Sequence, residues 1–221
     1  MVLLLLVLAV FFSIAAPSDG LSLLITTLVL AANLVIAMWA SGVRRKVLRA
    51  WLGFAALGIG SSAFIAITQA PRSAGGYLAM TSLLLTLATM GAIARRLWLN
   101  AEISVLTVLA AVCIYVLLGM SFAFTFECLG EFGSGPFFTT PEAGTRSDYT
   151  YFSFITMATV GYGDLTAQGG LGRAFAVTEG LLGQIYLVTT VAALVGNLGR
   201  TRRPSEEIDS VRQVQDESRQ G

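Results

Sequence analysis

The chain has 221 residues, of which 55% are hydrophobic, 12% are charged and none is histidine, and its formal net charge is +1 at pH 7. Soluble domains carry about 25% charged residues, so this composition predicts a protein that crosses a membrane several times. The lack of histidine removes the usual general base and the commonest metal ligand, which argues against an enzyme and a metal centre. Cys113 and Cys128 are expected to lie far apart, so they do not predict a disulfide.

Six apolar stretches are candidates for membrane spans, each of which needs about 20 residues. They cover residues 2–16, 21–40, 51–70, 77–94, 103–126 and 171–198. The first is short and ends at Pro17, but no basic residue precedes it, which favours a retained helix. A cleaved signal peptide, cut near the small residues Ser13, Ala15 and Ala16, is the alternative. We therefore expect an all-α membrane protein with about six transmembrane helices.

Basic residues predict the orientation, because loops rich in Lys and Arg stay in the cytoplasm. Three basic clusters follow the second, fourth and sixth stretches: Arg44, Arg45, Lys46 and Arg49; Arg95 and Arg96; and Arg200, Arg202 and Arg203. If the spans alternate, all three clusters are cytoplasmic and residues 127–170 lie outside. We expect a plasma-membrane protein with a cytoplasmic C-terminus, whose residues 204–221 form a short tail that is frayed or weakly helical.

Residues 156–164 read TMATVGYGD and lie just before the last apolar stretch. Glycine takes a positive φ at little cost, and Gly161 and Gly163 are two residues apart, so the backbone can alternate in hand. Such an alternation aims backbone carbonyls at one axis, where they and the Thr159 hydroxyl can replace the water around a potassium ion. Val160 and Tyr162 would then point away from that axis. The alternative is an extracellular loop with a glycine-rich turn.

This run resembles the selectivity filter of tetrameric potassium channels, and residues 103–199 are similar to their pore domain. The resemblance implies an outer helix, a re-entrant pore helix over residues 148–158, a filter and an inner helix. It also implies a homotetramer, because one filter strand supplies a quarter of each ion site. The implied ion-binding residues are Thr159, Val160, Gly161, Tyr162 and Gly163, with K⁺ bound at the first four.

The six-span layout resembles a small prokaryotic member of the voltage-gated superfamily. We divide the chain into a sensor-like region of four spans (1–98), a pore domain (99–203) and the tail (204–221). A voltage sensor needs arginines at every third residue through the membrane, and residues 77–94 contain none. We therefore expect little voltage gating.

The resemblance also implies side chains that support the filter. Tyr151 and Phe152 stand where the family usually has two tryptophans. Tyr151 can donate its hydroxyl to Asp164, whereas Phe152 cannot donate, so one bracing hydrogen bond is expected to be absent. Ile155 stands where some bacterial channels have a glutamate behind the filter.

The last apolar stretch contains residues that we expect to contact the pore helix, form the gate and line the cavity. Glu179 lies about 140° around the helix from Gln184, so it is predicted to face the pore helix. It either supports the filter or is solvated at the outer membrane boundary. Gly183 matches the gating-hinge glycine of the family, with close packing against the outer helix as the alternative. Residues at helical spacing are expected to line the cavity and inner gate: Gln184, Leu187, Val191 and Val195.

The outer loops are expected to attract cations, because acidic residues outnumber basic ones there and a tetramer multiplies the surplus. The acidic residues are Glu127, Glu131, Glu142, Asp148 and Asp164, against Arg146 and Arg173. Asp164 is expected to lie nearest the ion path, because it follows the filter directly. Ordinary solvated loop residues are the alternative for Glu127, Glu131 and Glu142.

Together these features predict a potassium channel that conducts passively and is not an enzyme. We expect K⁺ in the filter and lipid around the protein, with no organic cofactor, small-molecule substrate or nucleic acid. The alternatives are a weakly selective cation channel, a membrane enzyme and a non-conducting regulatory subunit. Val160 and Tyr162 argue against the first, because relaxed filters usually change them. The lack of a catalytic constellation argues against the second, and the intact filter motif argues against the third.

Overall fold

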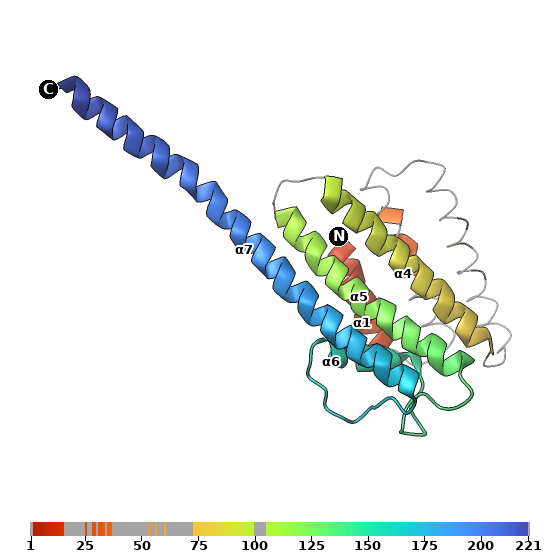
Figure 1. Ribbon diagram of the computed structural model, residues 1–221. Coiled ribbons are helices and arrows are strands. Elements are labelled where there is room, and N and C mark those ends of the chain that lie inside the picture. The colour runs from red at the N-terminus through yellow and green to blue at the C-terminus, as the bar shows by residue number, and fades with distance from the viewer. Residues whose placement is uncertain are drawn as a thin grey trace.

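The computed structural model describes residues 2–15, a few positions between 25 and 60, and residues 73–99 and 105–220. Figure 1 labels these helices in the described part of the chain: α1 (Val2–Ala15), α4 (Ser73–Leu99), α5 (Val105–Phe132), α6 (Arg146–Met157) and α7 (Gly170–Gln220). In these ranges no strand forms, and the loop between α5 and α6 meets the loop between α6 and α7 in one isolated bridge, Phe138 to Ala167. The all-helical class is therefore confirmed for the part of the chain that the structure describes.

Among the described residues, three helices are long and apolar enough to cross a membrane, over Gly75–Leu99, Val105–Phe132 and Gly170–Ala193. They correspond to the fourth, fifth and sixth stretches predicted from the sequence. The first stretch forms α1, a shorter helix of 14 residues. The stretches predicted at 21–40 and 51–70 lie largely outside the described residues, so the number of six spans stays a prediction.

The helices α4, α5 and α7 are all longer than the apolar stretches predicted for them. α5 continues to Phe132, so Glu127 and Cys128 lie within a helix and not in an outer loop. The helix continues because its polar positions find partners there, such as the pairing of Glu127 with Arg146. The tail was expected to be frayed or weakly helical, and the backbone of α7 is helical as far as Gln220. Figure 1 shows this end extending beyond the other helices.

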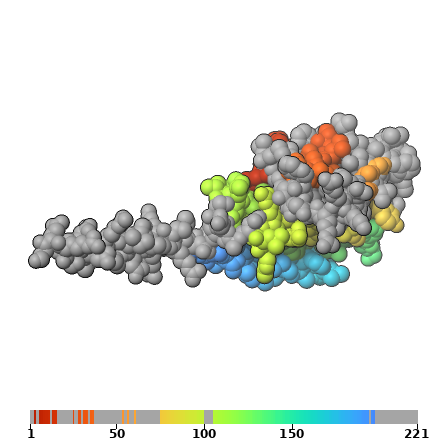
Figure 2. Space-filling view, turned by 90° about the horizontal axis from the view of Figure 1, so that it is seen from above, coloured from red at the N-terminus to blue at the C-terminus, as the bar shows by residue number. Residues whose placement is uncertain are grey.

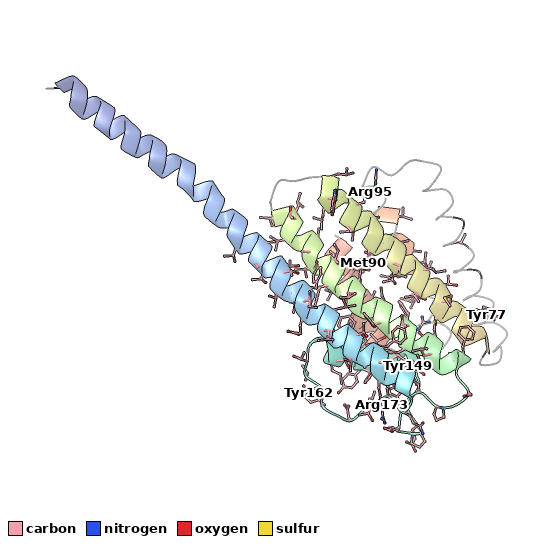
Figure 3. The ribbon with its side chains drawn as sticks, viewed as in Figure 1. Tyr77, Met90, Arg95, Tyr149, Tyr162 and Arg173 are labelled. Atoms are coloured by element: carbon pink, nitrogen blue, oxygen red, sulfur yellow. The ribbon has the colours of Figure 1, made fainter. Side chains whose placement is uncertain are left out.

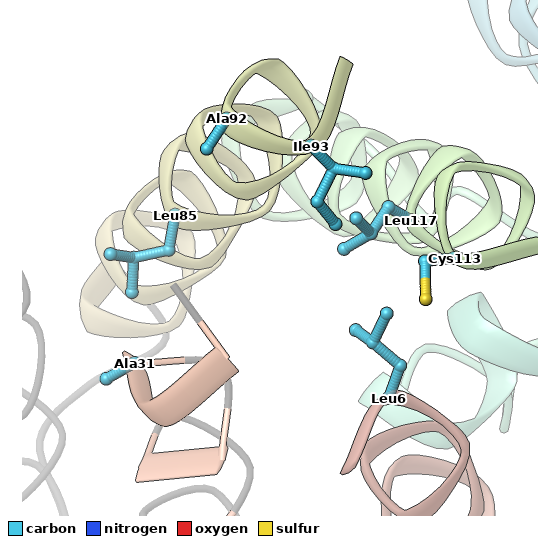
Figure 4. Close-up of a cluster of buried hydrophobic side chains, with 7 residues drawn as sticks. All are labelled: Leu6, Ala31, Leu85, Ala92, Ile93, Cys113 and Leu117. Carbon is cyan, nitrogen blue, oxygen red and sulfur yellow. The ribbon is translucent and has the colours of Figure 1, made fainter. Parts of the chain in front are cut away.

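An apolar core joins α1, α4 and α5. Figure 4 shows the side chains that form it: Leu6, Ala31, Leu85, Ala92, Ile93, Cys113 and Leu117. α4 and α5 lie side by side along this core (Figure 1). Cys113 is buried here, and neither it nor Cys128 forms a disulfide.

α7 lies at the edge of the described body, where Figure 2 shows it as a blue band. Only 11% of the most apolar 18-residue stretch of α7 is buried, compared with 44% of the corresponding stretch in α4 and 33% in α5. Burying apolar surface is the main favourable term in folding and association. The exposed surface of α7 therefore needs lipid or another protein chain to cover it.

Candidate functional site

The start of α6 is determined by a capping box. The hydroxyl of Thr145 accepts from the backbone N–H of Asp148 at 3.3 Å, and the carboxylate of Asp148 accepts from the backbone N–H of Thr145 at 2.8 Å. These reciprocal bonds satisfy amides that a helix leaves unpaired at its first turn. The pore helix predicted over 148–158 therefore begins two residues earlier, at Arg146. The spacing of Thr145 and Asp148 is the sequence signal that could have indicated this start.

The segment after α6 alternates in backbone hand. Positive φ angles occur at Thr159 (57°), Gly161 (51°) and Gly163 (80°), with Val160 and Tyr162 between them. The expected conformations of the two glycines are confirmed. The left-handed conformation of Thr159 was not predicted, because it costs a residue with a Cβ about 1–2 kcal/mol.

The first residues of this segment are tied to the end of α6. The amides of Val160 and Gly161 both donate to the carbonyl of Ile155, at 2.9 and 3.2 Å, and the amide of Thr159 donates to Thr156 at 3.0 Å. Ile155 thus contacts the segment through its backbone carbonyl. The family resemblance had drawn attention to its side chain instead.

The far end of the segment is held by a side-chain bond. The hydroxyl of Tyr151 donates to the carboxylate of Asp164 at 2.8 Å, so the contact expected from the sequence is confirmed. This hydrogen bond raises the pKa of the Tyr151 phenol above its ordinary value, because the neighbouring carboxylate favours the protonated form. Tyr151 therefore stays a donor throughout the neutral range.

Aromatic rings from α5, α6 and the loop between them form a buried cluster. Phe152 is buried there and packs at centroid distances of 5.1 Å on Phe126, 5.4 Å on Phe138 and 6.1 Å on Phe137. It makes no side-chain hydrogen bond, as its chemistry requires. Aromatic pairs at such separations stabilise by more than the area they bury, so this cluster fixes α6 against α5.

The loop between α5 and α6 clamps the residues that follow Asp164. Thr139 donates its amide to the carbonyl of Thr166 at 3.0 Å, and their hydroxyls lie 2.7 Å apart. Gln168 donates its amide to the carbonyl of Phe137 at 2.8 Å. This clamp was not predicted from the sequence. The adjacent aromatic residues at 137 and 138 were the available signal, since a solvated loop rarely needs two.

Glu179 is fully buried and faces α6. The hydroxyl of Ser153 lies 2.5 Å from one of its carboxyl oxygens and 2.7 Å from the carbonyl of Gly119 on α5. The predicted orientation of Glu179 is therefore confirmed, and the alternative that it is solvated at the membrane boundary is wrong. Its role in supporting the filter stays a prediction.

Gly183 lies against α6. The packing alternative had placed it against the outer helix instead. A Cβ at this position would lie 2.7 Å from Cγ of Met157. On α5, a Cβ on Gly119 would lie 2.8 Å from Cε of the same methionine. The two glycines therefore let α5 and α7 approach the end of α6 closely. The hinge role of Gly183 stays a prediction.

The residues predicted to line a cavity are exposed on α7. They are Gln184, Leu187, Val191 and Val195. Leu181, Ile185 and Val188 are exposed as well, each at 58–67%. The exposed apolar surface of α7 is therefore wider than one cavity-lining stripe.

The charged residues in and near the loops that were predicted to lie outside the membrane are less free than expected. The guanidinium of Arg146 donates to the carboxylate of Glu127 at 3.0 and 3.1 Å, both side chains are 9% exposed, and the guanidinium lies 5.3 Å from the centroid of the Phe124 ring. Asp148 is engaged in the cap described above, and Arg173 donates to the carbonyl of Ala167 at 3.0 Å. Glu127 therefore belongs to a buried ion pair and not to a solvated loop.

The C-terminal end of α1 contacts α6, which the sequence did not indicate. The hydroxyls of Ser13 and Thr150 lie 2.8 Å apart, and the hydroxyl of Ser147 donates to the carbonyl of Ile14 at 2.7 Å.

Figure 3 places Arg95 near one end of the helical body and Tyr162 near the other. The basic end of α4 and the TVGYG segment therefore lie at opposite ends of the body.

Comparison with known proteins gives two matches. Residues 102–199 match the family model described as "Ion channel". A relative named "Calcium-activated potassium channel slo-1", from Caenorhabditis elegans, is 37% identical over 94 residues, which are 41% of this chain and 8% of the relative. The chain thus matches a small part of that much longer protein, and no solved structure matches it. These matches, with the apolar helices, support a membrane protein with an ion-channel domain.

Proposed function

We propose that four copies of this chain form a potassium-selective channel that conducts K⁺ passively across the plasma membrane. The observation that carries the proposal is the alternation of positive φ at Thr159, Gly161 and Gly163 within the run TVGYG. In the proposed filter, the carbonyls of residues 159–162 and the hydroxyl of Thr159 replace the water around each ion. The similarity of residues 102–199 to ion channels supports the same conclusion.

The tetramer is supported by what a single chain leaves exposed. Val160 is 50% exposed and Tyr162 is 73% exposed, although both are expected to pack behind the filter strand. The apolar surface of α7 is also open. In a tetramer a neighbouring chain would cover both regions. The filter would complete each ion site with equivalent carbonyls from four chains.

The proposed ion path continues below the filter. α6 would be the re-entrant pore helix, and the negative end of its dipole would favour a cation in the central cavity. Gln184, Leu187, Val191 and Val195 would line this cavity, which makes the inner gate mostly apolar and able to close by losing its water. Gly183 would be the point at which α7 bends.

The channel is proposed to be nearly independent of voltage, because α4 carries no arginine between Ser73 and Ala94. A weakly selective cation channel is the second candidate, and the missing hydrogen-bond donor at Phe152 is the observation that favours it. A non-conducting regulatory subunit is the third, although its TVGYG segment would have no reason to keep this backbone geometry.

A flux assay with purified protein tests the proposal. Vesicles loaded with K⁺ or with Na⁺ are diluted into a buffer without either ion, and release is followed after a proton carrier is added. We expect rapid release of K⁺ and little release of Na⁺. Equal release of both ions would favour the weakly selective channel, and release of neither would favour the regulatory subunit.

A further inference from the structure

The hydroxyl of Ser153 lies between two oxygen atoms and has one hydrogen to donate. One is Oε1 of Glu179, at 2.5 Å, and the other is the carbonyl oxygen of Gly119, at 2.7 Å. Both distances are within the range of an O–H···O hydrogen bond. A hydroxyl donates one hydrogen and can accept through its lone pairs. Ser153 can donate in only one of the two bonds, so the partner in the other bond must supply the hydrogen. The backbone carbonyl of Gly119 has no hydrogen, which leaves the carboxyl group of Glu179.

An ionised Glu179 does not satisfy this geometry. If Ser153 donated to a carboxylate, its oxygen would face the carbonyl of Gly119 at 2.7 Å with no hydrogen between them. The second carboxyl oxygen, Oε2, is buried and has no hydrogen-bond donor among the residues that the structure describes. A buried carboxylate needs a charged partner or several donors, and here it would have one donor at most.

A protonated Glu179 satisfies both contacts of Ser153. Its carboxyl hydrogen bonds to the oxygen of Ser153, and the hydrogen of Ser153 bonds to the carbonyl of Gly119. The two bonds connect α7, α6 and α5 in series. We infer that Glu179 carries a proton and that it is a positioning residue, which holds α6 between the two longer helices by donating a hydrogen bond.

The consequence for conduction rests on the proposed function. The carbonyl of Ile155, two residues after Ser153, anchors the first filter amides, so a shift of α6 would move the filter. The Tyr115 phenol on α5 is the titratable group that a charge on Glu179 would affect. On α6, Tyr149 packs in the aromatic cluster and Tyr151 bonds to Asp164. Loss of the Glu179 proton at alkaline pH should therefore release α6 and disturb the filter.

Infrared spectroscopy of the full-length protein in lipid tests the protonation directly and needs no conduction. At neutral pH the spectrum should contain the carbonyl stretch of a buried, protonated carboxylic acid. Glu179→Gln should remove this band, whereas Glu142→Gln, which changes an exposed loop carboxylate, should leave it in place. Ser153→Ala should shift the band, because the carboxyl loses its acceptor. Absence of the band, or its persistence in Glu179→Gln, would overturn the inference.

Conduction supplies the second test. Glu179→Gln keeps a hydrogen-bond donor, so it should fold and conduct selectively, whereas Glu179→Ala should lose selectivity. In the wild type, each pH unit above the titration midpoint lowers the protonated fraction about tenfold, and open probability should fall with it. Glu179→Gln should show no such fall. A Gln variant that unfolds, or that loses selectivity like the Ala variant, would show that the negative charge is needed. If the wild type does not conduct K⁺ at all, the proposed function fails while the infrared result stands.

Discussion

Two halves of the described chain are stabilised internally by different kinds of contact: the half around α1 and α4, and the half from the end of α5 to the start of α7. Around α1 and α4 the buried side chains are mainly aliphatic, and hydroxyls such as Thr86 and Thr89 bond within their own helix. Between the end of α5 and the start of α7, specific polar pairs accompany the aromatic cluster: an ion pair, a capping box, the bond from Tyr151 to Asp164 and the contact of Ser153 with Glu179.

This difference indicates where substitutions matter. Aliphatic cores tolerate volume-conserving changes at a cost that is usually below about 1.5 kcal/mol. A buried ion pair or a residue with positive φ tolerates few changes, because each substitution leaves a charge, a polar group or a strained backbone behind. The half that contains the TVGYG segment should therefore be the sensitive one, and four predictions test this.

The largest effect is expected at Gly163. Its φ is +80°, and a methyl group on its Cα would meet nothing within 4 Å beyond its chain neighbours. An Ala at this position would therefore be disfavoured by backbone strain and not by steric crowding. We expect Gly163→Ala to abolish K⁺ selectivity or current in bilayer recordings. Gly135→Ala is the matched control, because its site is also open but has no positive φ. A selective Gly163→Ala channel would contradict the filter geometry.

The ion pair of Glu127 and Arg146 should come next. Removing one partner of a buried pair leaves the other charge uncompensated, so Glu127→Ala should lower the free energy of unfolding by about 3–5 kcal/mol. Chemical unfolding in detergent measures the change. Glu142→Ala, in an exposed loop, should stay within about 0.5 kcal/mol of the wild type. Equal effects of the two variants would show that the pair adds nothing to this half of the chain.

A smaller effect is expected at the contact between α7 and α6. Gly183→Ala brings a methyl group to 2.7 Å from Cγ of Met157, and overpacking of this kind costs about 1–3 kcal/mol. Gly91→Ala on α4 meets nothing within 4 Å and should stabilise its helix by up to about 1 kcal/mol. Thermal unfolding should therefore move in opposite directions for the two variants. A stabilising Gly183→Ala would refute the close contact.

The smallest effect is expected at the basic end of α4. One charge crossing the whole field is worth about 2.3 kcal/mol per 100 mV, and steep gating needs three or four such charges in each subunit. Arg95 and Arg96 are exposed at the helix end, with no arginine before them in α4. Replacing both with Gln should leave the voltage dependence of open probability unchanged. Steep gating that disappears in the double variant would identify α4 as a sensor.

Much of the sensitive half could be predicted from the sequence, because its chemistry is local. The glycine spacing predicted the φ angles of Gly161 and Gly163, and helical geometry predicted that Glu179 faces α6. The family resemblance also paired Tyr151 with Asp164 correctly. The first two inferences needed only neighbouring residues and one regular element, whereas the third needed the resemblance.

The features that were missed depend on partners that are distant in the chain. The clamp of Thr139 on Thr166, the ion pair of Glu127 and the contact of Ser13 with Thr150 join residues 19 to 137 positions apart. No periodicity indicates such pairings. The positive φ of Thr159 was missed for another reason, since local propensity disfavours it and the surrounding hydrogen bonds hold it in place.

The reversal potential of single channels tests the central claim most directly. Purified protein is placed in a planar bilayer with K⁺ on one side and Na⁺ at equal concentration on the other. We predict unitary currents that reverse far from zero, at a potential set by K⁺ and unchanged when Na⁺ is replaced by an impermeant cation. Currents that reverse near zero, or a reversal potential that ignores K⁺, would contradict a filter built on the TVGYG segment.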